Sequence, residues 1–239
     1  MNTGHLTENT FHAVVPAAGS GSRMGSATPK QYLPLLGRPV LRHTLDRLLS
    51  VPSLAAVWVV LSPDDADWTR YEWPEDARLR VLRVGGASRA ASVANALTAI
   101  SGETSAETWV LVHDAARACV DPADVENLIS TLANDPVGGI LAAPLADTLK
   151  RADGETRVAQ TIPREGLWLA QTPQMFRLGL LQRALAAAPN VTDEAGAIEA
   201  LGLAPRLVPG KSSNFKLTYP EDLALAARIL SGEAERKEA

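Results

Sequence analysis

Two long cations stand in or just after a glycine-rich loop near the start of the chain. The loop follows the apolar run AVV and reads PAAGSGSRMG over residues 16–25, with Arg23 inside it and Lys30 soon after it in TPKQY. Small residues at the end of a strand let backbone N–H groups approach a ligand closely, and such groups attract phosphate. Arginine and lysine would add fixed positive charge for a polyphosphate. The other interpretation is a glycine-rich turn with two solvated cations, and the loop alone favours neither.

Neither of two common phosphate-binding motifs fits this loop. A dinucleotide fingerprint has the spacing G-x-G-x-x-G, whereas Gly19, Gly21 and Gly25 give G-x-G-x-x-x-G. A Walker A loop needs its lysine directly after the last glycine, but Lys30 follows only after four other residues. The decision therefore depends on what the rest of the chain brings to the same place.

The elements that must position this loop are short apolar runs that alternate with helix-like segments. Strands that are apolar on both faces and separated by helices indicate a mostly parallel sheet with helices on both faces. The sequence therefore predicts an α/β, Rossmann-like, doubly wound fold in a single domain over residues 1–239. The predicted strands are 12–17, 56–62, 79–84, 108–114 and 138–144, and the predicted helices among them are 39–50, 88–100 and 123–134.

The second half of the chain continues this pattern less regularly. Residues 167–175 return to the core, and residues 178–188 predict a helix. A further helix is predicted over 192–202, with Thr192 or Asp193 as its N-cap. Residues 215–230 predict a strand followed by a helix.

Three predicted strands end in segments that suit ligand binding. In open α/β sheets, ligands bind beyond the carboxyl ends of the strands. PAAG follows the first strand, GGASRAAS (85–92) the third, and the fourth ends in His113 and Asp114, with Arg117 soon after. Asp114 is either a helix cap or a ligand for a metal ion or a hydroxyl group. His113 is better explained as a structural residue than as a ligand. Together the three strand ends favour a nucleotide site.

A polar segment interrupts the alternation at residues 146–166, which read ADTLKRADGETRVAQTIPREG. It is too long for a tight turn, so it is either a disordered loop or a hairpin arm that reaches a partner. It carries Thr148, Lys150 and Arg164, which a solvated loop would not need. We expect a β-arm that pairs with the same arm of a second chain to form a homodimer.

Composition and charge exclude several classes of protein. Of 239 residues, 46% are hydrophobic and the net charge is −4, so any anion must be held by a local cluster of cations. The lone Cys119 excludes an internal disulfide and suits a reducing compartment. No secretory signal and no apolar run of about 18 residues is found, and no basic stretch interleaves the tryptophans. We therefore expect a cytoplasmic protein with neither nucleic acid nor membrane as a partner.

Seven segments, taken in order, resemble the 2-C-methyl-D-erythritol 4-phosphate cytidylyltransferase family. They read PAAGSGSRM…PKQYLPL, GGASRAASV, VHDAAR, ADTLKR, WLAQTPQ, TDEA and KLTYPEDLALA, and they cover about residues 12–230. The glycine-rich loop is shared by many nucleotidyltransferases. The combination of VHDAAR with DTLKR, TDEA and the late K-x-T-x-PEDL is much more specific. Ala118 departs from the family, in which many members carry proline after HDAAR, and this difference concerns loop rigidity rather than chemistry.

The resemblance implies an enzyme that joins CTP to 2-C-methyl-D-erythritol 4-phosphate (MEP), with Mg²⁺ as cofactor, in the non-mevalonate isoprenoid pathway. The phosphate of MEP is already mostly a dianion at neutral pH, so the reaction needs fixed cations rather than a general base. Asp114 is also the candidate Mg²⁺ ligand, and Thr148 and Arg164 would reach the partner subunit's site. The resemblance assigns catalysis to Arg23, Lys30, Arg164 and Lys216, nucleotide binding to Ala17, Ala18, Gly19, Gly86, Ala87 and Ser92, and substrate binding to Asp114, Arg117, Thr148, Thr172 and Thr192.

Two other functions stay open at this point. A cytidylyltransferase for another polyol phosphate, such as ribitol 5-phosphate, would share the nucleotide half of the site. A nucleotide-binding regulator that has lost catalysis is the alternative outside the enzymes. The presence of both Arg23 and Lys30 argues against such a regulator.

Overall fold

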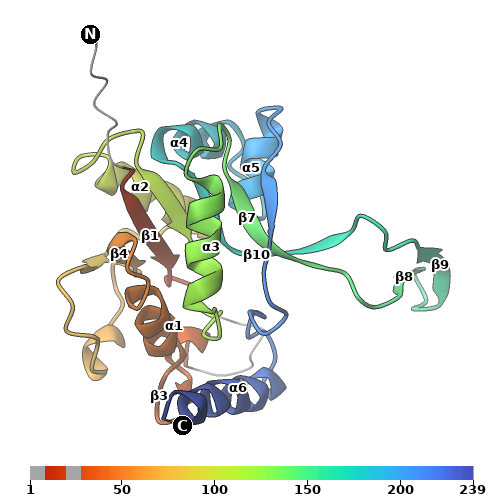
Figure 1. The fold of residues 1–239 in the computed structure, drawn as a ribbon, viewed down its shortest axis with the longest axis horizontal. Helices are drawn as coiled ribbons and strands as arrows, with labels where there is room; N and C mark the ends of the chain where they lie inside the picture. The colour runs from red at the N-terminus through yellow and green to blue at the C-terminus, as the bar shows by residue number, and fades with distance from the viewer. Residues whose placement is uncertain (1–8, 20–27, 239) are drawn as a thin grey trace.

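A mixed, mostly parallel sheet of seven strands forms the centre of the protein (Figure 1). The computed structural model describes residues 9–19 and 28–238. Along the sheet the order is β11-β7-β10-β6-β1-β4-β5, and β10 is antiparallel to both of its neighbours, whereas the other pairs are parallel. This confirms the predicted fold class. The strands are β1 (Phe11–Pro16), β4 (Leu54–Val60), β5 (Leu79–Leu82), β6 (Trp109–Val112), β7 (Gly139–Pro144), β10 (Trp168–Arg177) and β11 (Arg206–Pro209).

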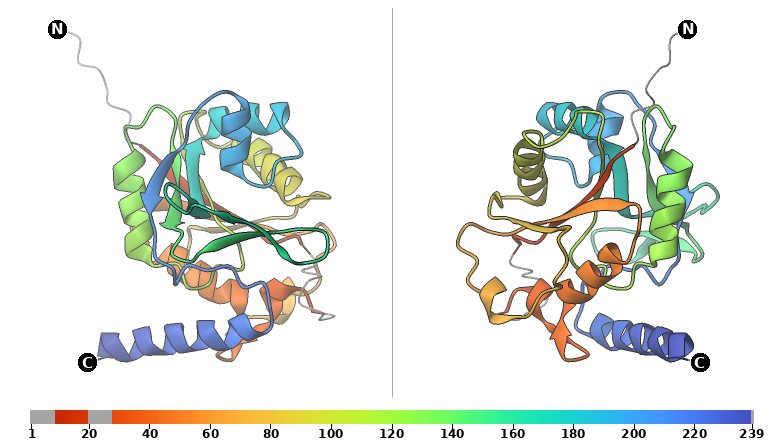
Figure 2. Two further views of the ribbon diagram at one scale, coloured as in Figure 1. Left: turned by 90° about the vertical axis from the view of Figure 1, so that its right-hand side faces the viewer. Right: turned by 60° about the vertical axis from the view of Figure 1, so that its left-hand side comes forward.

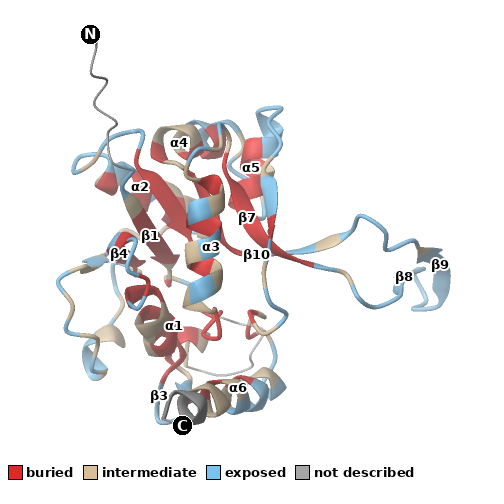
Figure 3. Ribbon diagram, viewed as in Figure 1, coloured by how far each residue is buried: buried red, intermediate tan, exposed pale blue. Residues whose placement is uncertain are grey.

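Helices cover both faces of the sheet because its strands are apolar on both sides. Along β1, Ala13 and Val15 pack in one buried cluster with α1 (Val40–Leu49) and α3 (Pro122–Leu132). Val14 points the other way and packs with the second group of helices, as the two-residue period of a strand requires. Figure 3 shows the resulting layer of buried strands between helices. The second group comprises α2 (Arg89–Ile100), α4 (Leu178–Ala187) and α5 (Glu194–Ala200).

The last helix, α6 (Glu221–Glu238), lies beyond one end of the sheet (Figure 2). It packs against the short hairpin of β2 (Pro34–Leu35) and β3 (Arg38–Pro39) through a small apolar cluster that includes Leu35 and Ala226. The described part of the chain also contains the 3-10 helices η2 (Lys30–Tyr32) and η3 (Trp68–Arg70).

The strand predicted just before α6 is wrong. Leu217 N–H donates to the Ala116 carbonyl, and the N–H groups of Thr218 and Tyr219 both donate to the Asp222 carboxylate. These backbone groups therefore find partners in a loop and at the start of a helix, and no strand ladder forms over residues 215–218.

A two-stranded hairpin projects from the body of the protein between β7 and β10 (Figure 1). Its strands are β8 (Leu149–Ala152) and β9 (Val158–Ile162), which pair antiparallel with each other and with no strand of the central sheet. Side chains on both strands are exposed, including the apolar Leu149 and Val158. Its role as a dimerisation arm stays a prediction. Among the helices of the described part of the chain, none is long and apolar enough to cross a membrane.

Candidate active site

The loops at the carboxyl ends of β1, β5 and β6 meet around a cavity of about 730 Å³. A smaller cavity of about 190 Å³ adjoins it, and Arg89, Asp114 and Lys216 line both. The structure thus brings together residues predicted from three separate segments. The larger cavity is lined by Ala17, Ala18, Gly19, Lys30, Gly86, Ala87 and Ser92 among the predicted residues, and the smaller one by Arg117, Thr172 and Thr192.

Close packing of the loop after β5 against the first turn of α2 explains why residue 86 is a glycine. A Cβ atom built on Gly86 would lie 2.7 Å from the Cβ of Ala91, a distance that real side chains do not reach. Gly86 N–H donates to the Ser92 hydroxyl oxygen at 3.0 Å, and that hydroxyl donates to the Ser88 carbonyl at 2.9 Å. The buried Ser92 therefore holds the turn in shape while it forms part of the cavity wall.

Lys30 is presented to the larger cavity by the 3-10 helix η2. The next residue, Gln31, is buried and donates a 2.7 Å hydrogen bond to the Ala17 carbonyl, so this turn is tied to the end of β1. Tyr32 donates from its hydroxyl to the Asp65 carboxylate at 2.8 Å and fixes the other side of the turn. Arg23, the second predicted cation of this loop, lies outside the described residues.

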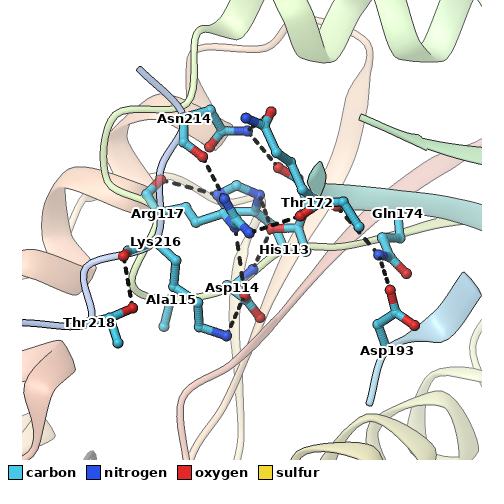
Figure 4. A network of polar contacts seen from close by, with 12 residues as sticks. His113, Asp114, Ala115, Arg117, Thr172, Gln174, Asp193, Asn214, Lys216 and Thr218 are labelled. Atoms are coloured by element: carbon cyan, nitrogen blue, oxygen red, sulfur yellow. Dashed lines mark hydrogen bonds and ion pairs between the residues drawn. The ribbon is translucent and has the colours of Figure 1, made fainter. Parts of the chain in front are cut away.

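Asp114 is the centre of a cluster of three cations, and Figure 4 shows two of them, Arg117 and Lys216. Its Oδ1 accepts from Arg89 Nε at 2.9 Å, and its Oδ2 lies 2.8 Å from Lys216 Nζ. Arg117 Nε lies 3.6 Å from the same Oδ2. Burial alone would raise the pKa of Asp114, but the charges of Arg89 and Lys216 outweigh it and hold this pKa well below its usual range. The carboxylate is therefore ionised.

This arrangement does not fit Asp114 as a metal ligand. Both of its oxygens face cationic groups, which would repel a divalent ion. Over residues 9–19 and 28–238, no group of three or more His, Cys, Asp and Glu side chains could hold a metal ion. Asp114 is not a helix cap either, because no helix begins after it and the N-cap of α3 is Asp121. Its contacts are those of a counter-ion that orients the cations.

Hydrogen bonds of His113 and Thr172 hold the backbone of Asp114 in place. Thr172 lies where the pairing of β10 with β7 is interrupted, and its hydroxyl oxygen accepts from Asp114 N–H at 3.0 Å. The hydroxyl also lies 3.1 Å from His113 Nδ1, while His113 Nε2 lies 3.2 Å from the Arg117 carbonyl. Because a carbonyl can only accept, Nε2 carries the proton and Nδ1 accepts from Thr172. Complete burial lowers the pKa of His113 to about 4, so the ring is neutral.

Arg117 forms its hydrogen bonds with backbone carbonyl groups, although its side chain also lines the smaller cavity. Its Nη1 donates to the Asn214 carbonyl at 2.5 Å and its Nη2 to the Ala170 carbonyl at 3.4 Å. Asn214 in turn donates from its side chain to the Thr172 carbonyl at 2.8 Å. These bonds fix the segment that carries Lys216, two residues farther along the chain.

The segment before α5 borders the smaller cavity. The N-cap of this helix is Asp193, which accepts from Gly196 N–H, so capping does not explain Thr192. Gln174 on β10 clamps the turn, since it donates to Asp193 at 2.9 Å and accepts from Ala195 N–H at 2.8 Å. Thr192 is thereby held in the wall of the cavity.

Sequence reasoning missed Arg89 and Glu194. Arg89 donates to Glu194 through both terminal nitrogens, at 2.7 and 3.0 Å, and to Asp114 through Nε. The available signals were the positions of Arg89 in GGASRAASV and of Glu194 in TDEA, two of the segments that carry the family resemblance. Nothing local indicates a partner that is 105 residues away.

Thr148 and Arg164 lie in neither cavity. Arg164 is exposed and donates to the Ala146 carbonyl at the base of the β8–β9 hairpin. A single chain therefore does not bring these two predicted residues to the others.

A family model described as 2-C-methyl-D-erythritol 4-phosphate cytidylyltransferase matches residues 11–232. Proteins of that name from Dechloromonas aromatica and Laribacter hongkongensis are 61% and 60% identical over 220 residues, covering 92% and 91% of this chain and 96% and 95% of their own lengths. A crystal structure of 4-diphosphocytidyl-2C-methyl-D-erythritol synthase superimposes with a TM-score of 0.83 at 39% identity and covers 93% of this chain and 99% of its own.

Proposed function

The chain belongs to the family of 2-C-methyl-D-erythritol 4-phosphate cytidylyltransferases, and from that premise we propose how its two cavities divide the reaction. The enzyme is a nucleotidyltransferase that joins CTP and MEP to give 4-diphosphocytidyl-2-C-methyl-D-erythritol and pyrophosphate in the non-mevalonate pathway. We assign the larger cavity to CTP and the smaller one to MEP. The observation that carries this assignment is that Arg89, Asp114 and Lys216 line both cavities.

The assignment of CTP to the larger cavity follows from the size and lining of that cavity. Its volume of about 730 Å³ lies in the range of small-molecule sites. Backbone groups of Ala17, Ala18, Gly19, Gly86 and Ala87 would meet the base and the phosphates, because no large side chains stand in the way. Ser92 supports this wall through its bond to Gly86 N–H.

The transfer step is an in-line displacement at phosphorus. A phosphate oxygen of MEP forms a bond to the α-phosphorus of CTP, and the bond from that phosphorus to the bridging oxygen of pyrophosphate breaks. The attacking group is a dianion, so no proton has to be removed from it. The barrier is electrostatic, because two anions approach while charge grows on the leaving pyrophosphate. Lys30 and Arg23 would stabilise the triphosphate, and Lys216 would meet both phosphates.

The cofactor proposal is Mg²⁺ that arrives bound to the triphosphate of CTP. Phosphate oxygens and water are its usual ligands in such sites, and it would neutralise part of the phosphate charge. The residues in the described part of the chain offer it no cluster of carboxylate, histidine or cysteine ligands of their own.

The assembly proposal is a homodimer of two single-domain chains, each with an arm at residues 146–166. The exposed Leu149 and Val158 on the two hairpin strands support a partner at this surface. Thr148 and Arg164 would then reach the smaller cavity of the partner subunit. We also propose a cytoplasmic location, in keeping with a buried cysteine that has no disulfide partner.

The test is a coupled assay with CTP, Mg²⁺ and a panel of polyol phosphates that includes MEP and ribitol 5-phosphate. Pyrophosphate release, read as phosphate after pyrophosphatase, should be fastest with MEP. Equal or faster release with ribitol 5-phosphate would mean that the smaller cavity is not specific for MEP. No release with any member of the panel would contradict the proposed catalysis.

A further inference from the structure

Glu194 is a carboxylate with no exposed surface, and it lines neither cavity. It is the first residue of α5 and lies directly after the N-cap Asp193. Burial raises the pKa of Glu194, and the charge of Arg89 opposes this rise. A carboxylate in such a place is costly unless a cation and hydrogen bonds compensate it.

The compensation comes from one side chain. The planar guanidinium of Arg89 donates to both oxygens of Glu194, through Nη1 at 2.7 Å and Nη2 at 3.0 Å. Such a two-pronged contact fixes the plane of the guanidinium as well as its position. The third nitrogen of the guanidinium, Nε, then donates to Asp114 Oδ1, 2.9 Å away.

The fixed guanidinium lies on the boundary between the two cavities. Arg89 lines both of them, and so do its neighbours Asp114 and Lys216. Asp114 is bonded through its two oxygens to Arg89 and to Lys216. Any rotation of Arg89 would therefore change the charge seen by Asp114 and, through it, the place of the Lys216 ammonium.

From these contacts we propose that Glu194 is a positioning residue for the transfer reaction. It acts through Arg89, which it orients so that Arg89 and Lys216 meet the phosphates of the two substrates at the junction of the cavities. This inference rests on the proposed assignment of the cavities. The turn that carries Glu194 is itself held in place by Gln174, which contacts Asp193 and Ala195.

The test is a double-mutant cycle on kcat/KM for CTP and for MEP, measured well below the unfolding temperature and normalised to the folded fraction. In Glu194→Gln an NH2 group replaces one carboxylate oxygen. It cannot accept from Arg89, so one of the two hydrogen bonds is lost. We expect kcat/KM to fall roughly ten- to a hundredfold, as for other small misplacements of a catalytic array. Arg89→Met should lower it at least as much.

The cycle separates positioning from structural support. If Glu194 acts through Arg89, adding Glu194→Gln to Arg89→Met should change kcat/KM by less than about twofold. The double variant removes both charges together, which avoids leaving a buried charge without a partner. The control is Asp46→Asn on α1, which breaks an ion pair with Arg42 of 2.9 Å outside both cavities and should leave kcat/KM unchanged.

Two results would overturn the proposal. Glu194→Gln could lower the unfolding temperature and leave kcat/KM at the wild-type value, which would make its role structural. The losses of the two single variants could also multiply in the double variant, which would show that Glu194 acts independently of Arg89. Wild-type turnover of CTP and MEP, measured in the same series, tests the proposed function separately.

Discussion

Gly85 and Ala18 lie in contact across the ends of two strands, so that a Cβ atom built on Gly85 would stand 2.4 Å from the Cβ of Ala18. The same atom would lie 2.8 Å from the Leu61 carbonyl oxygen, which is a rigid part of the backbone. Gly85 N–H also donates to that carbonyl at 2.8 Å. Only glycine allows these two loops to approach closely enough to form the wall of the larger cavity.

The first prediction follows from this contact. Gly85→Ala should lower the free energy of unfolding by about 1–3 kcal/mol, the usual cost of forcing an extra methyl group into a packed place. The measurement is urea unfolding followed by circular dichroism. The matched control is Gly102→Ala, where the nearest atom to the new Cβ lies 3.7 Å away, an ordinary contact. Equal stability of the two variants would show that the loops can separate at little cost.

Lys30→Ala should lower kcat roughly a hundredfold or more, as for the loss of one donor that stabilises transition-state charge. The fold should persist, because the neighbouring Gln31 and Tyr32 hold the turn. Arg70→Ala, which removes an exposed cation from a surface ion pair, is the control and should leave turnover unchanged. Near-normal turnover of Lys30→Ala would show that this lysine does not stabilise the transition state.

For Arg23 the prediction comes from the sequence alone. Arg23→Ala should reduce kcat to a similar extent, and Arg23→Lys should not restore it fully if arginine contacts the phosphates through two nitrogens. Steady-state kinetics at saturating CTP and MEP would measure both. Full activity of Arg23→Lys would mean that a point charge suffices.

The enzyme should prefer CTP to UTP by roughly a hundredfold or more in kcat/KM. Backbone groups of Ala17, Ala18 and Gly86 form the small-residue wall against which we place the base. Carbonyl groups there could accept from the amino group of cytosine, and a site that bonds a specific group strongly rejects analogues that lack it. Competition between the two nucleotides in one assay measures the ratio, and equal rates would refute the assignment of this wall.

His113 should make stability dependent on pH. Its pKa is near 6.5 when unfolded and about 4 when folded, so the unfolded state takes up a proton first as the pH falls. Its contribution is therefore fully present above pH 6.5, decreases between pH 6.5 and 4, and amounts to about 3 kcal/mol. Urea unfolding at several pH values should show a smaller acid-induced loss for His113→Asn than for the wild type. Parallel curves for the two proteins would contradict this.

The arm can be tested by mixing two inactive chains. If Arg164 acts in the partner subunit's site, Arg164→Ala and Lys30→Ala should restore each other when they are refolded together, since each mixed dimer has one site with both residues intact. Random pairing would return up to about a quarter of the wild-type activity. Size-exclusion chromatography checks the dimer. A fully active monomer, or exchange of subunits without recovery, would exclude shared sites.

Much of this protein was determined by local sequence patterns. Apolar runs with two buried faces set the five predicted strands, and the residues that follow them identified the strand-end loops of the larger cavity. Such features depend on neighbours in the chain, so periodicity and small-residue composition reveal them. The family resemblance added roles for Thr172, Thr192 and Lys216, which no local pattern indicated by itself.

Only the tertiary structure decided how distant segments meet. β10 enters between β6 and β7 in the opposite direction, and the backbone at Leu217 bonds to the Ala116 loop instead of forming a strand. The contacts of Arg89 with Asp114 and Glu194 join residues 25 and 105 positions apart. The attraction and hydrogen bonds among these charges must offset the cost of burying them, and the place where they meet exists only after the sheet has assembled. The sequence therefore determined which residues stand at the strand ends, and the fold determined which of them form ion pairs with one another.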